Sequence, residues 1–298
     1  MFSAYWYGKA KPFPTGKRLA EHCRTLIRHG ITDYVPQWGL DNARRYLEET
    51  DARKVCSSEG LTITLGLGLD TQSPRVAAHE AKVTAAILDA QSARVAGLCD
   101  RVSLDWEGWW NGGARKAAAA RIAARVLEDF PDAPAHTDDC PWWAPLSYID
   151  DAGRSRATHP GAPTREFGRL VGRRYVQAYG AQADGSPDGR SLRFLAWSRH
   201  PSQYASLGRW EILPTTQLYA RSLHDQIATL TAEPEQRLWT FNQINKEASL
   251  ALRVVEALRL KGFTGPEAVR DFQRAETIAV DGIVGPVTLH RLGLGPKP

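Results

Sequence analysis

The chain has 298 residues, of which 43% are hydrophobic and 24% are charged, so wholesale disorder, a collagen-like chain and a coiled coil are excluded. This length fits two average domains of about 150 residues, or one large domain with a small appendage. The net charge of +5 comes from Arg residues spread singly along predicted helices without a basic cluster, which excludes nucleic acid as the main partner.

Eight short runs rich in β-branched and aromatic residues alternate with longer stretches of helical periodicity, which predicts βα units and a parallel sheet. The predicted strands cover residues 2–7, 32–38, 61–69, 101–106, 133–137, 174–179, 210–218 and 237–241. Predicted helices cover residues 15–29, 41–58, 75–97, 114–129 and 246–259. Eight such units predict an α/β fold, a (β/α)₈ TIM barrel over residues 1–260.

A stretch rich in Pro, Gly, Ser and Asp follows the fifth predicted strand, over residues 144–164. This composition predicts a long loop over one face of the barrel. In barrels of this kind, the loops after the carboxyl ends of the strands usually shape the substrate site.

No segment that would enter a membrane or direct secretion is recognisable. No apolar run approaches the roughly 20 residues needed to span a bilayer, and the first residues lack a basic stretch followed by an apolar one. We therefore expect no membrane insertion, no Sec signal and synthesis in the cytoplasm.

Four cysteines occupy positions that are more than 30 residues apart, at Cys23, Cys56, Cys99 and Cys140. No Cys-x-x-Cys pair marks a zinc or redox site, so we expect no metal and no cofactor. Buried free thiols are the default for such cysteines, and a disulfide between two of them is the alternative.

The fourth predicted strand carries the residues that point to chemistry. Because side chains alternate along a strand, Ser103, Asp105 and Glu107 face one way, whereas Val102 and Leu104 face the other. Two carboxylates at the carboxyl end of a barrel strand would lie in the mouth, where enzymes of this fold act. An isolated Asp-x-Glu can also form salt bridges with a helix Arg, but the interleaved apolar residues and the Trp pair that follows favour a site.

The run Asp100-Arg-Val-Ser-Leu-Asp-Trp-Glu107 resembles the Asp-Gly-x-Asp-x-Asp-x-Glu signature of glycoside hydrolase family 18. That family includes chitinases and N-acetylglucosaminidases on (β/α)₈ barrels. Weaker similarities lie in the first, third, sixth and eighth predicted strands, at residues 4–8, 60–68, 177–179 and 239.

The resemblance implies a role for three residues of this chain. Glu107 would be the general acid, Asp105 would orient the substrate's N-acetyl group, and Tyr179 would contact the carbonyl of the same group. The chain departs from the signature at Ser103, which replaces the middle Asp, and at Arg101, which replaces the usual Gly. Without that Asp, Asp105 has no carboxylate with which to share a proton.

Ten tryptophans are many for this length, and several fall near the carboxyl ends of predicted strands. Flat aromatic faces suit sugar rings, although core packing explains any single Trp as readily. The predicted substrate-binding set consists of Trp6, Trp38, Trp109, Trp110, Trp142 and Trp239.

Residues 261–298 are predicted to form a small helical appendage. Residues 268–292 resemble the second half of the type 1 peptidoglycan-binding domain, whose pattern is AV-x-x-FQ, then V-DG-x-x-GP-x-T and a closing Leu. The predicted core of this segment consists of Phe272, Val280, Ile283, Val284 and Leu292. Asp281-Gly282 and Gly285-Pro286 are predicted to supply a tight turn and a helix start. A helical cap on the barrel is the alternative.

A sugar-hydrolase barrel and a wall-binding appendage both point to peptidoglycan as the partner of a monomeric hydrolase. We expect cleavage of the glycan chain of the N-acetylglucosaminidase type, by a phage endolysin or an exported lytic enzyme acting on the bacterial cell wall. One alternative is a muramidase similar to family 25 lysozymes, whose barrel also carries Asp-x-Glu on a strand. Others are a non-catalytic wall-binding lectin on a decayed barrel and a chitinase.

Overall fold

The computed structural model describes thirteen stretches of the chain. They are residues 2–7, 13–38, 43–68, 76–105, 113–131, 137–138, 145–149, 155–160, 173–177, 211–216, 222–232, 235–238 and 246–298.

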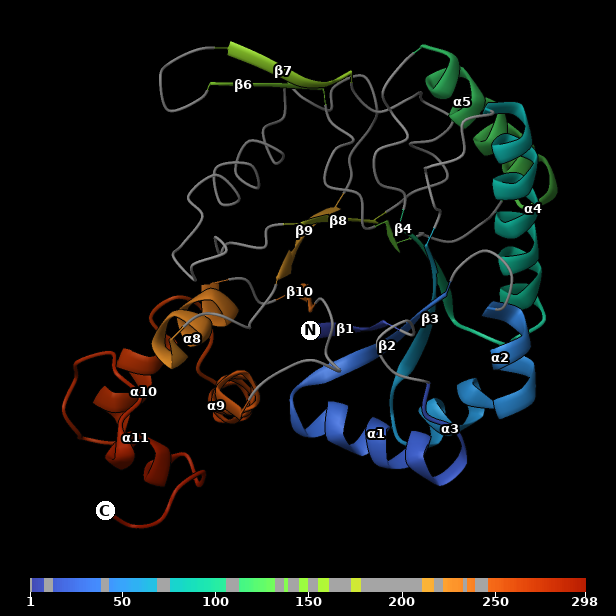
Figure 1. The fold of residues 1–298 in the computed structure, drawn as a ribbon. Coiled ribbons are helices and arrows are strands. Elements are labelled where there is room, and N and C mark those ends of the chain that lie inside the picture. The colour runs from blue at the N-terminus through green and yellow to red at the C-terminus, as the bar shows by residue number, and fades with distance from the viewer. Residues whose placement is uncertain are drawn as a thin grey trace.

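Eight parallel strands form a closed barrel in the order β1-β10-β9-β8-β5-β4-β3-β2 (Figure 1). These strands are β1 (Phe2–Tyr7), β2 (Ile31–Trp38), β3 (Thr62–Gly68), β4 (Arg101–Asp105), β5 (Thr137–Asp138), β8 (Arg173–Gln177), β9 (Glu211–Thr216) and β10 (Gln236–Leu238). The barrel closes because β1 pairs with β2 on one side and with β10 on the other. The predicted (β/α)₈ TIM-barrel fold is confirmed.

Helices follow the strands and cover the outside of the barrel. They are α1 (Gly16–Arg28), α2 (Ala43–Thr50), α3 (Ala52–Ser58), α4 (Val76–Val95), α5 (Gly113–Asp129), α8 (Leu223–Ala232) and α9 (Lys246–Leu260). In α1, Leu19, Cys23 and Leu26 recur at spacings of four and three residues and are fully buried. This spacing places them on one side of the helix, which packs on the sheet.

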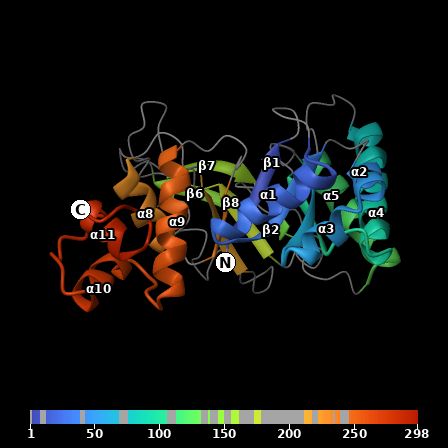
Figure 2. The ribbon, with the colours of Figure 1, turned by 90° about the horizontal axis from the view of Figure 1, so that it is seen from below.

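The last part of the chain forms α10 (Ala268–Ala275) and α11 (Pro286–Arg291). In both views these helices lie beside α8 and α9, at the opposite end of the molecule from α4 (Figures 1 and 2). α9 ends at Leu260, where the sequence predicts the end of the barrel. The division of the chain into two domains stays a prediction.

Two sequence predictions within the barrel are wrong in detail. The single helix predicted over residues 41–58 is interrupted at Asp51, whose φ of 47° is left-handed, so α2 and α3 are separate helices. No Gly or Pro marks this break, which is why the periodicity missed it. The fifth strand includes Thr137 and Asp138, whereas the prediction placed it over residues 133–137.

The long loop predicted over residues 144–164 is also wrong in part, because it contains an antiparallel hairpin. Its strands are β6 (Pro145–Ile149) and β7 (Ser155–Pro160), which form a two-stranded sheet separate from the barrel (Figure 1). The hairpin follows the carboxyl end of β5 after six residues. The connection therefore leaves the end of the barrel at which the sequence predicts the site.

The two sides of β2 define the inside and the outside of the barrel. The Tyr34 ring lies edge-on against His22 of α1, with 5.1 Å between the ring centroids, so Tyr34 faces the helices. Because side chains alternate along a strand, Asp33 and Gln37 face the barrel interior. Both are buried. The interior along β2 therefore carries two polar residues on either side of Val35, and the main apolar core lies between sheet and helices.

His22 is expected to make stability depend on pH. Burial lowers its pKa from 6.5 to about 4. The unfolded chain therefore binds this proton more readily than the folded chain, and the stability present above pH 6.5 is lost as the pH falls toward 4. The shift corresponds to about 3 kcal/mol of unfolding free energy.

Urea unfolding of the wild type and of His22→Leu at pH 7 and pH 4.5 measures this effect. The wild type should lose more stability between the two pH values than the variant does. His224→Leu, at an exposed position of α8, is the matched control and should behave like the wild type. Equal losses in the wild type and His22→Leu would contradict the assignment.

Candidate active site

The register of β3 and β4 places Asp105 inside the barrel. The Thr62 and Thr64 hydroxyls donate hydrogen bonds of 2.8 Å to the interior carboxylate of Asp33, so this side of β3 faces inward. Gly66 and Gly68 continue the same side. Ser103 pairs with Gly66, and Asp105 pairs with Gly68.

Asp105 is therefore the last interior position of β4, at the carboxyl end of the strand. Ser103 lies on the same side one step deeper and is fully buried. Val102 and Leu104 lie on the opposite side and belong to the apolar core. The predicted alternation along this strand is confirmed as far as Leu104, and the backbone register continues it to Asp105.

Glycines on β3 keep the wall next to Ser103 and Asp105 free of side chains. An added Cβ at Gly66 would lie 3.2 Å from the Gln37 Cα and 3.2 Å from the Pro36 carbonyl oxygen, so the backbone of β2 would have to give way slightly. The close approach of β2 therefore favours glycine at this position. As a consequence, β3 places no side chain beside the two interior residues of β4.

Asp33 is a buried carboxylate that the sequence reading did not single out. It pairs in register with Thr62, near the amino end of the barrel, and accepts hydrogen bonds from Thr62 and Thr64. Its place at the opposite end from Asp105 indicates a structural role. The sequence did contain a signal for this buried carboxylate. Asp33 lies within an apolar strand, and the next strand has Thr at alternate positions.

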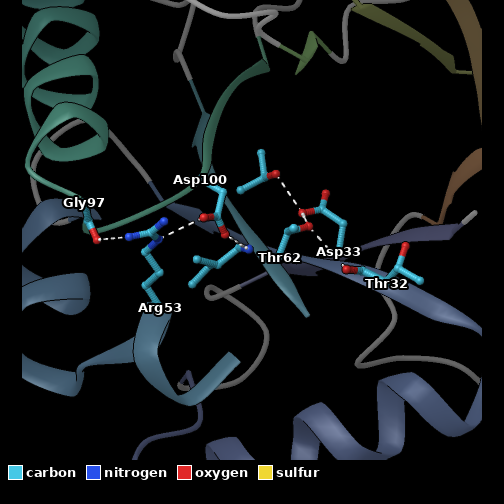
Figure 3. Close-up of polar contacts among 8 residues, drawn as sticks. Thr32, Asp33, Arg53, Thr62, Gly97 and Asp100 are labelled. Atoms are coloured by element: carbon cyan, nitrogen blue, oxygen red, sulfur yellow. Dashed lines mark hydrogen bonds and ion pairs between the residues drawn. The ribbon is translucent and has the colours of Figure 1, made fainter. Parts of the chain in front are cut away.

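The first carboxylate of the run that resembles the family 18 signature is structural. Asp100 Oδ1 accepts a hydrogen bond of 2.8 Å from Arg53 Nε of α3, and Asp100 Oδ2 accepts one of 2.9 Å from the Ile63 backbone N–H (Figure 3). Arg53 also donates to the Gly97 carbonyl, at 3.1 Å. Asp100 therefore joins α3, β3 and the start of β4 at the amino end, away from Asp105.

Removing the Asp100 carboxylate should reduce stability without a direct effect on chemistry. Asp100→Ala leaves the Ile63 N–H without this acceptor and should cost about 1–3 kcal/mol of unfolding free energy. Asp100→Asn keeps an acceptor and loses the partly exposed ion pair with Arg53, which should cost about 0.2–1 kcal/mol. Urea unfolding measures both values. A loss of hydrolysis by folded Asp100→Asn would contradict a purely structural role.

Most of the other predicted site residues lie outside the described residues. These are Glu107, Tyr179, Trp109, Trp110, Trp142 and Trp239. Trp6 is the next-to-last residue of β1, and Trp38 is the last residue of β2. The predicted position of these two at the carboxyl ends of their strands is confirmed.

The strands that precede Glu107, Tyr179 and Trp239 all end at the same end of the barrel. β4 ends two residues before Glu107, β8 ends two residues before Tyr179, and β10 ends one residue before Trp239. All barrel pairings are parallel, so these carboxyl ends meet at one end of the barrel. β4, β8 and β10 therefore end at the same end of the barrel.

The appendage is organised around a buried aromatic ring and a buried amide. Phe272 of α10 is fully buried and lies edge-on against Phe263, with ring centroids 5.6 Å apart. The Gln273 amide donates to Asp281 Oδ1 at 2.8 Å and to the Ile283 carbonyl at 3.0 Å. These hydrogen bonds join α10 to the turn before α11.

The predicted turn and helix start in the appendage are confirmed. Gly282 has a φ of 77°, which is left-handed, and its N–H donates to Gln273 Oε1 at 2.8 Å. Hydrogen bonds from the Ile283 N–H and the Gln273 amide lower the pKa of Asp281. Pro286 begins α11 after Gly285.

The predicted core of the appendage is partly wrong. Phe272, Val284 and Leu292 are buried, whereas Val280 is 46% exposed and Ile283 is 55% exposed. Both exposed residues lie in the irregular segment between α10 and α11, where the chain follows no helical period. Their place in the core is filled by residues of the helices, Ala268, Val269 and Thr288.

Two further features of the described residues bear on the site. No group of three or more His, Cys, Asp or Glu side chains there could hold a metal ion, and no helix there is long and apolar enough to cross a membrane. A groove of about 280 Å³ between α3 and the loop before β4 is lined by Arg53, Lys54, Ser57 and Gly97, among others. It lies on the amino side of β4 and is separate from the predicted site.

The fold defines the chain as a (β/α)₈ barrel, the class to which several solved glycosidases belong. A chitinase from Bacteroides thetaiotaomicron matches 84% of this chain and 94% of its own, with a TM-score of 0.52 and 10% identity. A GH18 chitinase from Pseudoalteromonas aurantia matches 84% of this chain and 96% of its own, with a TM-score of 0.49 and 13% identity.

An endo-beta-N-acetylglucosaminidase from Cordyceps militaris matches 85% of this chain and 88% of its own, with a TM-score of 0.47 and 10% identity. No protein-family model and no curated protein matches the sequence. At these identities the similarity shows the fold alone, so any assignment of chemistry depends on the residues of this chain.

Proposed function

We propose that the protein is a peptidoglycan hydrolase that cleaves the glycan chain with N-acetylglucosaminidase specificity. The observation that carries this proposal is the position of Asp105 at the carboxyl end of β4, on the interior side, two residues before Glu107. Active sites of (β/α)₈ enzymes lie at this end of the barrel. The barrel fold that this chain shares with a chitinase is consistent with the proposal.

In the proposed reaction, Glu107 donates a proton to the glycosidic oxygen as the bond to the anomeric carbon breaks. The substrate's own N-acetyl oxygen attacks that carbon, and Asp105 and Tyr179 hold the acetamido group in place. Substrate assistance of this kind is a known exception to the paired-carboxylate scheme. Water then opens the cyclic intermediate, and the Glu107 carboxylate takes up the proton from that water.

The signature of family 18 has a second Asp below the position of Asp105, and this chain has no carboxylate there. Ser103 occupies that position, and the glycines of β3 leave the neighbouring wall without side chains. β4 therefore places no second carboxylate below Asp105. We propose that Asp105 acts as an anion, which accepts a hydrogen bond from the acetamido N–H and stabilises positive charge on the cyclic intermediate.

The appendage supports peptidoglycan as the substrate. Its turn, its helix start and its buried Phe272 follow the pattern that resembles the type 1 peptidoglycan-binding domain. We propose that this segment raises the local concentration of the barrel on the wall and takes no part in chemistry. An endolysin, or a lytic enzyme exported by a dedicated route, fits this combination.

The proposal is tested by identifying which glycosidic bond is cleaved. Purified peptidoglycan is digested, reduced with borohydride and hydrolysed, and the reduced amino sugars are identified by mass spectrometry. Glucosaminitol ends are expected. Muramitol ends would support the second candidate, a muramidase similar to family 25 lysozymes, with Asp105 and Glu107 still on the same strand. If neither glucosaminitol nor muramitol ends form and the protein still binds sacculi, the result would support a wall-binding lectin.

A further inference from the structure

Two cysteines that are distant in the sequence touch in the outer layer of the barrel. Cys23 lies on α1 and Cys56 lies on α3, 33 positions later, and their Sγ atoms are 3.7 Å apart. Both are fully buried. All three cysteines among the described residues are free thiols, and the third, Cys99, precedes β4. Among the described cysteines, the sulfur–sulfur contact joins Cys23 and Cys56.

The two sulfur atoms are in non-bonded contact and would have to approach further to form a disulfide. A sulfur–sulfur bond is about 2.04 Å long, so the two Sγ atoms must approach by roughly 1.7 Å. α3 has only seven residues and begins after the left-handed Asp51. The proposal requires that side-chain rotation and a small shift of this short helix bring the sulfur atoms together.

The folded contact keeps the pair unreactive. The hydrogen bond with Cys23 and burial raise the pKa of the Cys56 thiol. A thiolate is the species that attacks a disulfide, so exchange requires that the pair be exposed first.

We propose that Cys23 and Cys56 are a redox site that closes into a disulfide by exchange with a small-molecule disulfide of the glutathione class. The thiolate of one cysteine attacks one sulfur of the reagent, and a mixed disulfide forms as the first reagent thiolate leaves. The thiolate of the other cysteine then attacks the protein sulfur of the mixed disulfide and releases the second reagent thiolate. Two protein thiols lose two protons and two electrons, and one reagent disulfide is reduced to two thiols.

Burial determines when this exchange takes place. Because neither sulfur is accessible in the folded chain, the reagent reaches the pair during folding or when α3 opens locally. The closed disulfide then joins α1 to α3 across a loop of 33 positions. Such a link stabilises mainly by restricting the unfolded chain.

The test uses the full chain, refolded in a buffer of oxidised and reduced glutathione and separately in a reducing buffer. Acid quenching, alkylation under denaturing conditions and peptide mass spectrometry without reduction then identify the linked cysteines. We expect a Cys23–Cys56 cross-linked peptide in the oxidised sample alone, and a rise in Tm of about 5 °C over the reduced sample.

Matched variants separate this pair from the other thiols. Cys99→Ala should keep the cross-link and the rise in Tm, whereas Cys23→Ala and Cys56→Ala should lose both. If a variant does not fold, the peptide map of the wild type alone decides the question. Full alkylation of Cys23 and Cys56 after oxidative refolding, or a link from either one to Cys99 or Cys140, would overturn the proposal.

Discussion

Glu107→Gln should abolish lysis of peptidoglycan while leaving the fold and wall binding intact. Gln has nearly the shape of Glu but has no proton to donate to the leaving oxygen. Removal of a positioned general acid typically lowers the rate by ~10²–10⁴-fold. The rate is measured as the release of reducing ends from purified sacculi, and Tm and sacculus pull-down are measured alongside.

Glu128→Gln is the control for this substitution. Glu128 lies on α5, pairs with Arg125 at an exposed position and faces away from the barrel interior. Its replacement should leave the rate unchanged. If Glu107→Gln is as active as Glu128→Gln, the general acid is another residue, and the resemblance to family 18 does not extend to its chemistry.

Phe272→Ala should unfold the appendage locally and thereby weaken binding to the wall. Phe272 is fully buried between Phe263 and the elements of the appendage, and loss of a buried Phe side chain typically costs about 3–5 kcal/mol. A segment of this size has little stability in reserve. The bound fraction on insoluble sacculi should fall, whereas hydrolysis of short soluble glycan fragments should persist.

Val280→Ala provides the comparison, because Val280 lies in the same segment and is 46% exposed. Its effect on stability should stay within about 0.5 kcal/mol. Hydrogen exchange of α10 and α11 reports whether unfolding is confined to the appendage. If Phe272→Ala removes protection from α9 and the barrel as well, the segment is a cap on the barrel and not a separate binding module.

The barrel could be predicted because its strands combine strong local signals with helices of clear period. Phe2–Tyr7 was predicted to the residue, and Arg101–Asp105 to within one residue. The hairpin was missed because β6 and β7 are rich in the residues that indicate loops, including Pro145 and Pro160. Pro and Ser at a sheet edge give no period that would distinguish a strand from a loop.

The candidate site could be predicted only in part. Alternation along a strand indicates which side of the sheet a residue faces, but not where the residue lies along the barrel axis. It placed Ser103 and Asp105 on one side of β4, as the register confirms. It could not show that Asp100 is held at the opposite end by Arg53 and the Ile63 N–H, because those partners come from other elements. The roles of Glu107 and Tyr179 stay predictions.

The pairing of β1 with β10 also constrains how the chain acquires its structure. Phe2 pairs with Gln236, so the seam joins segments more than two hundred positions apart. Contacts of such separation are slow to form, because the entropy of closing the loop is lost before the pairing is gained. Until β10 has emerged from the ribosome, β1 and β9 remain open edges that can pair with another chain. We therefore expect closure of the β1–β10 seam to be the step at which productive folding competes with aggregation during synthesis.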